Sequence, residues 1–168
     1  MKNIVITGST RGVGLCMAKE FLKAGCHVTI SGRSEKSFEL SKKELAEYTD
    51  SVFYAPCNVQ VRADIQALWD QSTKKWGHVD CWINNAGLNC SYDFAYNTEH
   101  DDVDAVLDDN QKFQKIFNIL ADRPETVAAF FIPRILQNTK NNAHITWLTT
   151  QKSMLRFMTA PFIERKLI

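Results

Sequence analysis

Apolar and polar positions alternate in two different ways along the first half of the chain. Short β-branched runs predict buried strands, and apolar residues spaced three or four positions apart predict the buried faces of helices between them. The expected strands are residues 2–7, 27–31, 52–55 and 79–84, and the expected helices are residues 12–24, 35–48 and 61–76. Gly25 and Gly77 are placed to end two of these helices, and Ser34 to cap the third. The alternation predicts an α/β domain with a doubly wound parallel sheet.

The pattern changes after Gly87. Residues 88–98 have no apolar period and predict a loop, and residues 99–109 hold six acidic side chains around a thin apolar stripe. That acidic stretch is either a metal cluster or the solvated face of a helix. Helical spacing returns at residues 113–120 and again after Pro124, where Pro133 is expected to kink or split the second helix. Residues 143–149 predict a last strand.

The tail after this strand is apolar with basic edges. Met154, Leu155, Phe157 and Met158 stand close to Lys152 and Arg156, and further apolar and basic residues follow at 162–166. Such a tail could contact a membrane or a partner. It could equally pack on the sheet or form a dimer contact, and the sequence leaves these alternatives open.

Composition narrows the class of protein. A chain of 168 residues with 45% hydrophobic and 23% charged residues is expected to form one globular domain, residues 1–168. A net charge of +1 gives no electrostatic case for nucleic acid as a partner, and no apolar run approaches a transmembrane segment. The five cysteines lack metal-ligand spacing, so no metal site is expected. Because a strand begins close to Met1, the chain is expected to be cytoplasmic, and plastidic only if a targeting segment had been removed.

The sequence between the first strand and the first helix carries the strongest chemical signal. Thr7-Gly8-Ser9-Thr10-Arg11-Gly12-Val13-Gly14 places three glycines in a strand-to-helix turn. Glycines permit a tight turn and a close backbone approach to phosphate, and the N–H groups at the start of the helix favour an anion. This context predicts a dinucleotide-binding loop.

Three more motifs follow the later strands and complete a resemblance. They are Ser31-Gly32-Arg33, Cys57-Asn58-Val59 and Asn84-Asn85-Ala86-Gly87. Together with the glycine loop, they resemble the short-chain dehydrogenases/reductases, whose fold is Rossmann-like. The stretches at 115–120, 123–128, 132–135 and 145–149 are similar to the C-terminal part of the chlorophyll(ide) b reductases within that superfamily.

The resemblance implies a cofactor site in residues 1–90. Residues Gly8, Ser9, Thr10, Arg11, Gly12, Val13 and Gly14 would cradle the pyrophosphate, Asn58 and Val59 would flank the adenine, and Asn85, Ala86 and Gly87 would line the ribose side. No acidic residue ends the second strand, where NAD(H) would need one. Arg11 and Arg33 instead suit a 2′-phosphate, so NADP(H) is favoured as the cofactor over NAD(H).

The catalytic half implied by the resemblance is missing. The family reduces or oxidises a carbonyl/alcohol pair with a Ser, a Tyr and a Lys four residues after the Tyr, but none of the four tyrosines here has that lysine. Asn110 could be a remnant of the family's helix asparagine. An internal deletion between about residues 109 and 112 explains the gap, and the last strand would then dock beside the fourth, giving the order 3-2-1-4-last. Residues 91–168 would supply helices, that strand and the tail.

Three functions stay open on this reading. The chain is an oxidoreductase by descent that transfers hydride to an unknown carbonyl substrate, a cofactor-binding or partner protein without catalysis, or a nonfunctional truncated product. A homo-oligomer is compatible with each of the first two.

Overall fold

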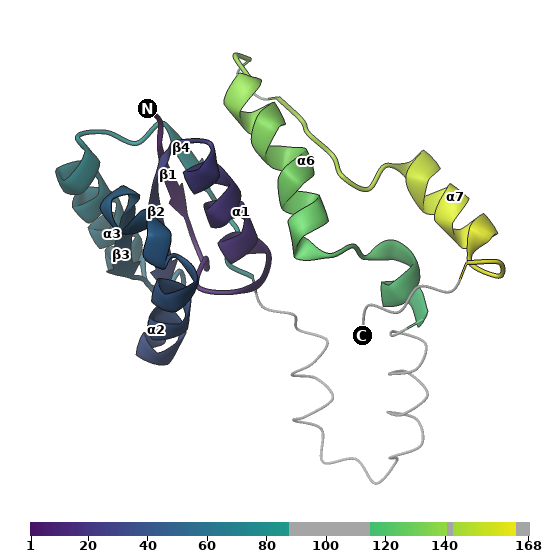
Figure 1. The fold of residues 1–168 in the computed structure, drawn as a ribbon, viewed down its shortest axis with the longest axis horizontal. Helices are drawn as coiled ribbons and strands as arrows, with labels where there is room; N and C mark the ends of the chain where they lie inside the picture. The colour runs from purple at the N-terminus through teal and green to yellow at the C-terminus, as the bar shows by residue number, and fades with distance from the viewer. Residues whose placement is uncertain (88–114, 141–142, 164–168) are drawn as a thin grey trace, which may run out of the picture.

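A computed structural model describes residues 1–87, 115–140 and 143–163 (Figure 1). Four parallel strands form one sheet in the order β3-β2-β1-β4, which confirms the predicted order of the first four. They are β1 (Asn3–Ile6), β2 (His27–Gly32), β3 (Val52–Pro56) and β4 (Cys81–Ile83). The chain therefore has the predicted α/β, doubly wound architecture, with helices flanking a parallel sheet.

The helices between these strands agree with the predicted ones except at their ends. They are α1 (Gly12–Lys23), α2 (Glu35–Glu44) and α3 (Arg62–Trp76), and the chain after α2 turns into the short 3-10 helix η1 (Ala46–Ser51). Gly25 and Gly77 follow α1 and α3 with φ of 78° and 85°, the left-handed conformation that glycine accepts most readily. Ser34 precedes α2 as expected, although its side chain makes no capping hydrogen bond.

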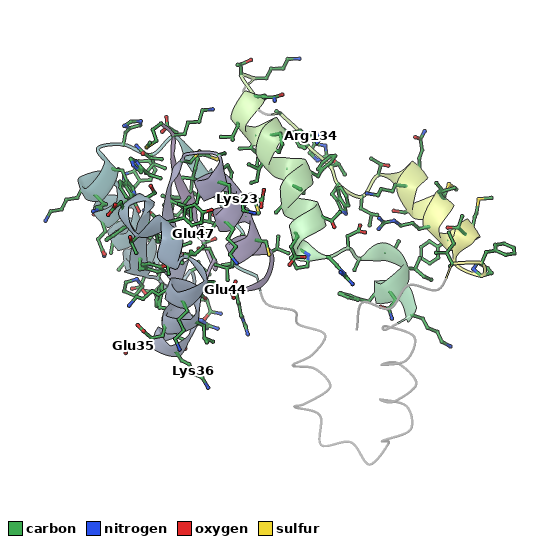
Figure 2. The ribbon with its side chains drawn as sticks, in the orientation of Figure 1. Lys23, Glu35, Lys36, Glu44, Glu47 and Arg134 are labelled. Carbon is green, nitrogen blue, oxygen red and sulfur yellow. The ribbon has the colours of Figure 1, made fainter. Side chains whose placement is uncertain are left out.

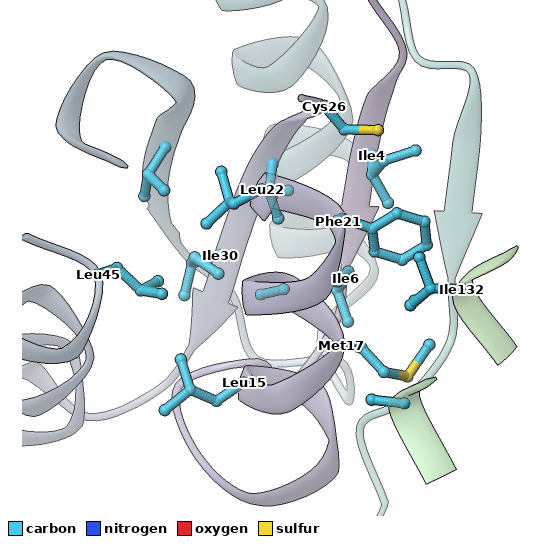
Figure 3. Packing of buried hydrophobic residues seen from close by; sticks show 14 of the residues in the cluster. Ile4, Ile6, Leu15, Met17, Phe21, Leu22, Cys26, Ile30, Leu45 and Ile132 are labelled. Carbon is cyan, nitrogen blue, oxygen red and sulfur yellow. The ribbon is translucent and has the colours of Figure 1, made fainter. Parts of the chain in front are cut away.

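Alternate residues of the strands bury two separate layers. Ile4, Ile6 and Ile30 face α1 and join a core that includes Phe21, which is fully buried (Figure 3). Val5 faces the other way, toward Leu68 of α3. Burying one side chain of the size of Phe21 stabilises the fold by about 1.5–3 kcal/mol. The two cores hold β1 rigidly, and β1 carries the glycine loop at its carboxyl end.

Residues 115–120 are helical, and α6 (Pro124–Gln137) packs beside α1 (Figure 1). Ala128 and Ile132 of α6 are buried in the same core as Phe21. The expectation that Pro133 could split this helix is wrong, because α6 continues to Gln137. The carbonyl that Pro133 leaves without its helical donor belongs to Ala129, which is exposed to water.

The prediction of a last strand at 143–149 is wrong. These residues form no strand, and the sheet in the described part of the chain ends at β4. Side-chain contacts hold the segment elsewhere: Trp147 donates from Nε1 to Asp122 Oδ2 at 2.8 Å and stacks edge-on against Phe130 of α6 at 4.9 Å between ring centroids. The order 3-2-1-4-last is therefore corrected to 3-2-1-4.

The tail forms α7 (Thr150–Thr159), and its apolar residues do not pack on the sheet. Among the described helices, none combines the length and the apolar character needed to cross a membrane. Within the same residues, no group of three or more His, Cys, Asp or Glu side chains is placed to hold a metal ion. The acidic stretch at 99–109, Asn110 and the proposed deletion lie outside the described residues.

Candidate functional site

The glycine loop joins β1 to α1 at the carboxyl edge of the sheet. Gly8 and Gly12 have φ of 63° and 58°, a conformation that a side chain would strain. The first hydrogen bond of α1 runs from the Leu15 N–H to the Arg11 carbonyl at 3.3 Å. The N–H groups of Gly12, Val13 and Gly14 precede it, and the start of a helix offers such groups no intrahelical acceptor. The backbone thus forms a concentrated group of donors at the positive end of α1.

The turn after β4 closes on this loop. Asn85 donates from Nδ2 to the carbonyls of Thr7 and Gly8, each at 3.0 Å. A Cβ at Gly14 would lie 2.5 Å from that Nδ2 atom and 2.7 Å from the Gly8 carbonyl. A Cβ at Gly8 would lie 2.9 Å from the Ala86 Cα. Packing against the Asn85 turn therefore requires glycine at positions 8 and 14.

Thr7 is the hydrogen-bonding centre of this contact. Its hydroxyl accepts hydrogen bonds from the N–H groups of Asn85 and Ala86 at 3.0 and 3.1 Å. The same hydroxyl donates to the Ile83 carbonyl at 3.3 Å. The Thr7 N–H donates to the same carbonyl at 3.0 Å. One buried hydroxyl thus fixes the first and fourth motifs against each other.

Two buried serines connect the loop to β2. The Ser9 N–H donates to the Ser31 carbonyl at 2.8 Å, and the Ser31 N–H donates to Ser9 Oγ at 2.9 Å. Both hydroxyls donate to the Ile6 carbonyl. A Cβ on Gly32 would lie 2.8 Å from Thr10 Cγ2, so β2 and the loop also touch directly.

The third motif follows β3 and is joined to β2. The Cys57 N–H donates to the Gly32 carbonyl at 2.9 Å, and burial raises the pKa of the Cys57 thiol. Asn58 donates from its N–H to Asp64 Oδ2 at 2.9 Å, and its Oδ1 accepts from the Gln60 N–H at 3.2 Å. Its amide oxygen is therefore engaged in the local turn. Val59 is 39% exposed beside it, which suits a surface for a flat apolar ring.

Cationic side chains flank the loop. Arg11 is the residue before α1, Arg33 follows β2 directly, and both are exposed. Neither takes part in an ion pair with a carboxylate among the described residues. Glu35 and Lys36 begin α2 and point away from the sheet (Figure 2). Within the part of the chain that the structure describes, no carboxylate therefore competes with an anion for the two arginines.

The structure brings the four predicted motifs together at one edge, through the contacts of Gly8, Gly14, Asn85 and Gly32. Three residues to which no cofactor contact was assigned prove to organise the site: Thr7, Ser31 and Asp64. Each had a signal in the sequence, because Thr7 and Ser31 end the predicted strands 2–7 and 27–31 and Asp64 lies in the first turn of α3, where a carboxylate is favoured. The Asn85 amide holds the glycine loop in place, and its expected position on the ribose side stays a prediction.

Comparisons with known proteins match more than half of the chain. The profile of the short chain dehydrogenase family matches residues 2–119. The chain is 41% identical over 105 residues to chlorophyll(ide) b reductase NOL, a chloroplastic protein of Arabidopsis thaliana, a match that covers 62% of this chain and 30% of that protein. It is 29% identical over 109 residues to the NADP-dependent 3-hydroxy acid dehydrogenase YdfG of Escherichia coli, covering 65% of this chain and 43% of that protein. The matched region thus spans less than half of either relative.

A solved structure gives the same fold. A Bacillus thuringiensis protein assigned as a 3-oxoacyl-reductase superposes with a TM-score of 0.50 at 23% identity, over 52% of this chain and 36% of that one. The superposition supports the sheet and its flanking helices. The cytoplasmic location expected from the sequence stays a prediction.

Proposed function

Because this chain belongs to the short chain dehydrogenase family, we propose that it binds a nicotinamide dinucleotide at the carboxyl edge of its sheet, as the cofactor half of an oxidoreductase. The observation that carries the proposal is the glycine loop. Its backbone is already held in shape by Thr7 and Asn85, and it presents the N–H groups of Gly12, Val13 and Gly14. Preorganised donors at a helix start bind a pyrophosphate without further folding.

The residues present fit such a group. A Cβ on Gly12 would meet open space among the described residues, so this exposed glycine leaves room for a phosphate directly against the backbone. Gly8, Ser9 and Thr10 shape the turn beneath it. Asn58 and Val59 would flank the adenine, while Asn85, Ala86 and Gly87 would line the ribose side. Bound NADPH would supply a hydride, and these residues would only bind and orient the cofactor.

The selectivity proposed is for NADP(H) over NAD(H). Arg33 directly follows β2, where an acid would be needed to bind a ribose 2′-hydroxyl, and Arg11 lies in the glycine loop. Guanidinium groups pair with phosphate through two parallel hydrogen bonds. The Escherichia coli relative is named as an NADP-dependent enzyme, which supports the same preference.

A second candidate is hydride transfer to a carbonyl, as in a chlorophyll(ide) b reductase. The 41% identity to the Arabidopsis thaliana relative favours it, but the sequence holds no Tyr-x-x-x-Lys. Without that tyrosine, no residue is assigned to donate the proton that the reduced carbonyl requires. We therefore propose cofactor binding as the function, with hydride transfer as the second candidate. NADPH oxidation that depends on chlorophyllide b or on a simple aldehyde would replace it with the second candidate.

The experiment is a fluorescence titration of the purified chain with NADPH and NADH. We expect saturable binding of NADPH, with Arg33→Ala reducing the NADPH-to-NADH affinity ratio by about 10- to 100-fold, as the loss of a charge-assisted contact predicts. Arg11→Ala should act in the same direction. Arg134→Ala, an exposed arginine on α6 that stacks on Phe130, is the matched control and should leave the ratio unchanged (Figure 2). Equal affinity for both cofactors in all variants would contradict the assigned selectivity.

A further inference from the structure

The turn that follows β3 is held by hydrogen bonds that use most of the polar atoms of Asn58. The Asn58 N–H donates to Asp64 Oδ2 at 2.9 Å, and the Asn58 carbonyl accepts from the Val61 N–H at 2.9 Å. The side-chain oxygen Oδ1 accepts from the Gln60 N–H at 3.2 Å. The side-chain nitrogen Nδ2, which carries two hydrogens, is the polar atom of Asn58 that these three bonds leave over.

The bond from Gln60 decides which way the Asn58 amide is turned. The opposite orientation would set the Nδ2 hydrogens against the Gln60 N–H, and two donors cannot bond to each other. Oδ1 is therefore the atom held against the turn, and Nδ2 is the atom that the planar amide offers to a ligand. Asn58 is half-buried, so a ligand can approach it and meets a hydrogen-bond donor.

This turn lies where the base of the proposed cofactor would be. Gly32 pairs with Pro56 in the sheet, and the Cys57 N–H donates to the Gly32 carbonyl. Asn58 therefore follows β3 beside the point where Arg33 follows β2, and neighbouring strands lie about 4.8 Å apart. The purine and the 2′-phosphate of NADP(H) are attached to the same ribose. A phosphate bound by Arg33 would thus place the purine within reach of Asn58.

We propose that Asn58 determines which purine base the site prefers, by donating from Nδ2 to acceptor atoms of the base. This inference rests on the proposed function, because it concerns the base of the cofactor that the site would bind. Its consequence is that a hypoxanthine dinucleotide binds at least as tightly as the adenine dinucleotide.

The preference follows from the hydrogen-bonding atoms of the two bases. Adenine presents an acceptor, N7, next to a donor, its 6-amino group, and an asparagine binds that pair through Nδ2 and Oδ1 together. Because Oδ1 of Asn58 is engaged by Gln60, the adenine amino group loses this acceptor. Hypoxanthine presents two acceptors, N7 and its 6-oxo group, and the two hydrogens of Nδ2 can be donated to both.

The test is a fluorescence titration of the whole chain with NADPH and with reduced nicotinamide hypoxanthine dinucleotide phosphate. Both probes carry the 2′-phosphate, so the contacts of Arg11 and Arg33 cancel when the two affinities are compared. We expect the wild-type chain to bind the hypoxanthine probe as tightly as NADPH or more tightly. Asn58→Asp keeps an oxygen for the Gln60 N–H and replaces Nδ2 by an acceptor, so the affinity ratio should shift toward NADPH by about 10-fold or more.

Asn138→Asp is the matched control for this variant. Asn138 follows α6, and its Oδ1 accepts from the Lys140 N–H at 3.2 Å, the same local bond to the second residue along the chain that Asn58 makes. The control adds the same charge in the same kind of turn and should leave the affinity ratio unchanged. An unaltered thermal transition confirms that each variant is folded, and the comparison of the two probes on the wild-type chain needs no variant.

Two results would overturn this inference alone. One is a wild-type chain that binds NADPH more tightly than the hypoxanthine probe. The other is a folded Asn58→Asp chain that keeps the wild-type affinity ratio. A chain that binds neither probe would contradict the proposed function and this inference with it, so the two failures are distinguishable.

Discussion

Replacing Gly14 by alanine tests the assembly of the cofactor site most severely. The added methyl would lie 2.5 Å from Asn85 Nδ2, 2.7 Å from the Gly8 carbonyl and 2.9 Å from Ser9 Cα. Two of these atoms belong to the backbone and cannot turn away. Overpacking of this kind costs about 1–3 kcal/mol, and displacing Asn85 from its two hydrogen bonds costs about 1 kcal/mol each. We expect a loss of about 3 kcal/mol or more, and a fall in Tm of roughly 6–12 °C for a chain of this length.

Gly77→Ala is the matched control for this change. Gly77 ends α3 with φ of 85°, and a Cβ there meets open space among the described residues, so only backbone strain of about 1–2 kcal/mol applies. Differential scanning calorimetry and NADPH titration of both variants separate the effects. Gly14→Ala should lose stability and cofactor binding together, whereas Gly77→Ala should lose stability alone. A Gly14→Ala chain with wild-type Tm and wild-type affinity would refute the packing described between the glycine loop and the Asn85 turn.

Three further predictions concern the contacts around this site and the tail. Thr7→Ala should cost about 2 kcal/mol in chemical denaturation, because it leaves the N–H groups of Asn85 and Ala86 without an acceptor, while Thr7→Ser should restore most of that stability. Burial raises the pKa of the Cys26 and Cys57 thiols above the ordinary value of 9.0, so the unfolded chain loses these protons first. Stability from them is present below about pH 9 and is lost as the pH rises further, so Tm should fall above about pH 9, and by less in a Cys26→Ala, Cys57→Ala variant. Asp122→Ala should release α7 and residues 147–156, seen as faster amide hydrogen exchange there, and an unchanged exchange rate would contradict the anchoring of α7 by the ion pair between Arg156 and Asp122.

The first half of the fold could be predicted because local and global signals agree there. The β-branched runs at Ile4–Ile6 and Val28–Ile30 are buried strands, and the glycines at 8, 25 and 77 have the left-handed backbone that their positions suggested. The strand predicted at 143–149 failed because a run of β-branched and aromatic residues does not specify its partner. Trp147 is held by Asp122 and Phe130, contacts between distant residues that no local pattern contains.

The candidate site was predictable in its location and less so in its internal organisation. Motifs at the carboxyl ends of parallel strands must meet at one edge, so the grouping of the glycine loop with Arg33 and Asn85 followed from topology. The topology did not predict which polar side chains form hydrogen bonds within the protein. Asn85 directs its amide to two carbonyls of the loop, and Thr7 accepts two backbone N–H groups, pairings that depend on register between β1 and β4.

The proposed binding site is tested most directly by amide hydrogen exchange of the whole chain with and without saturating NADPH. The account predicts slower exchange in residues 8–15, 31–34 and 84–87, where the glycine loop and its neighbouring turns lie, and no change in α7. Equal exchange in both samples, or protection confined to residues outside these turns, would contradict the assignment of this edge of the sheet as the cofactor site.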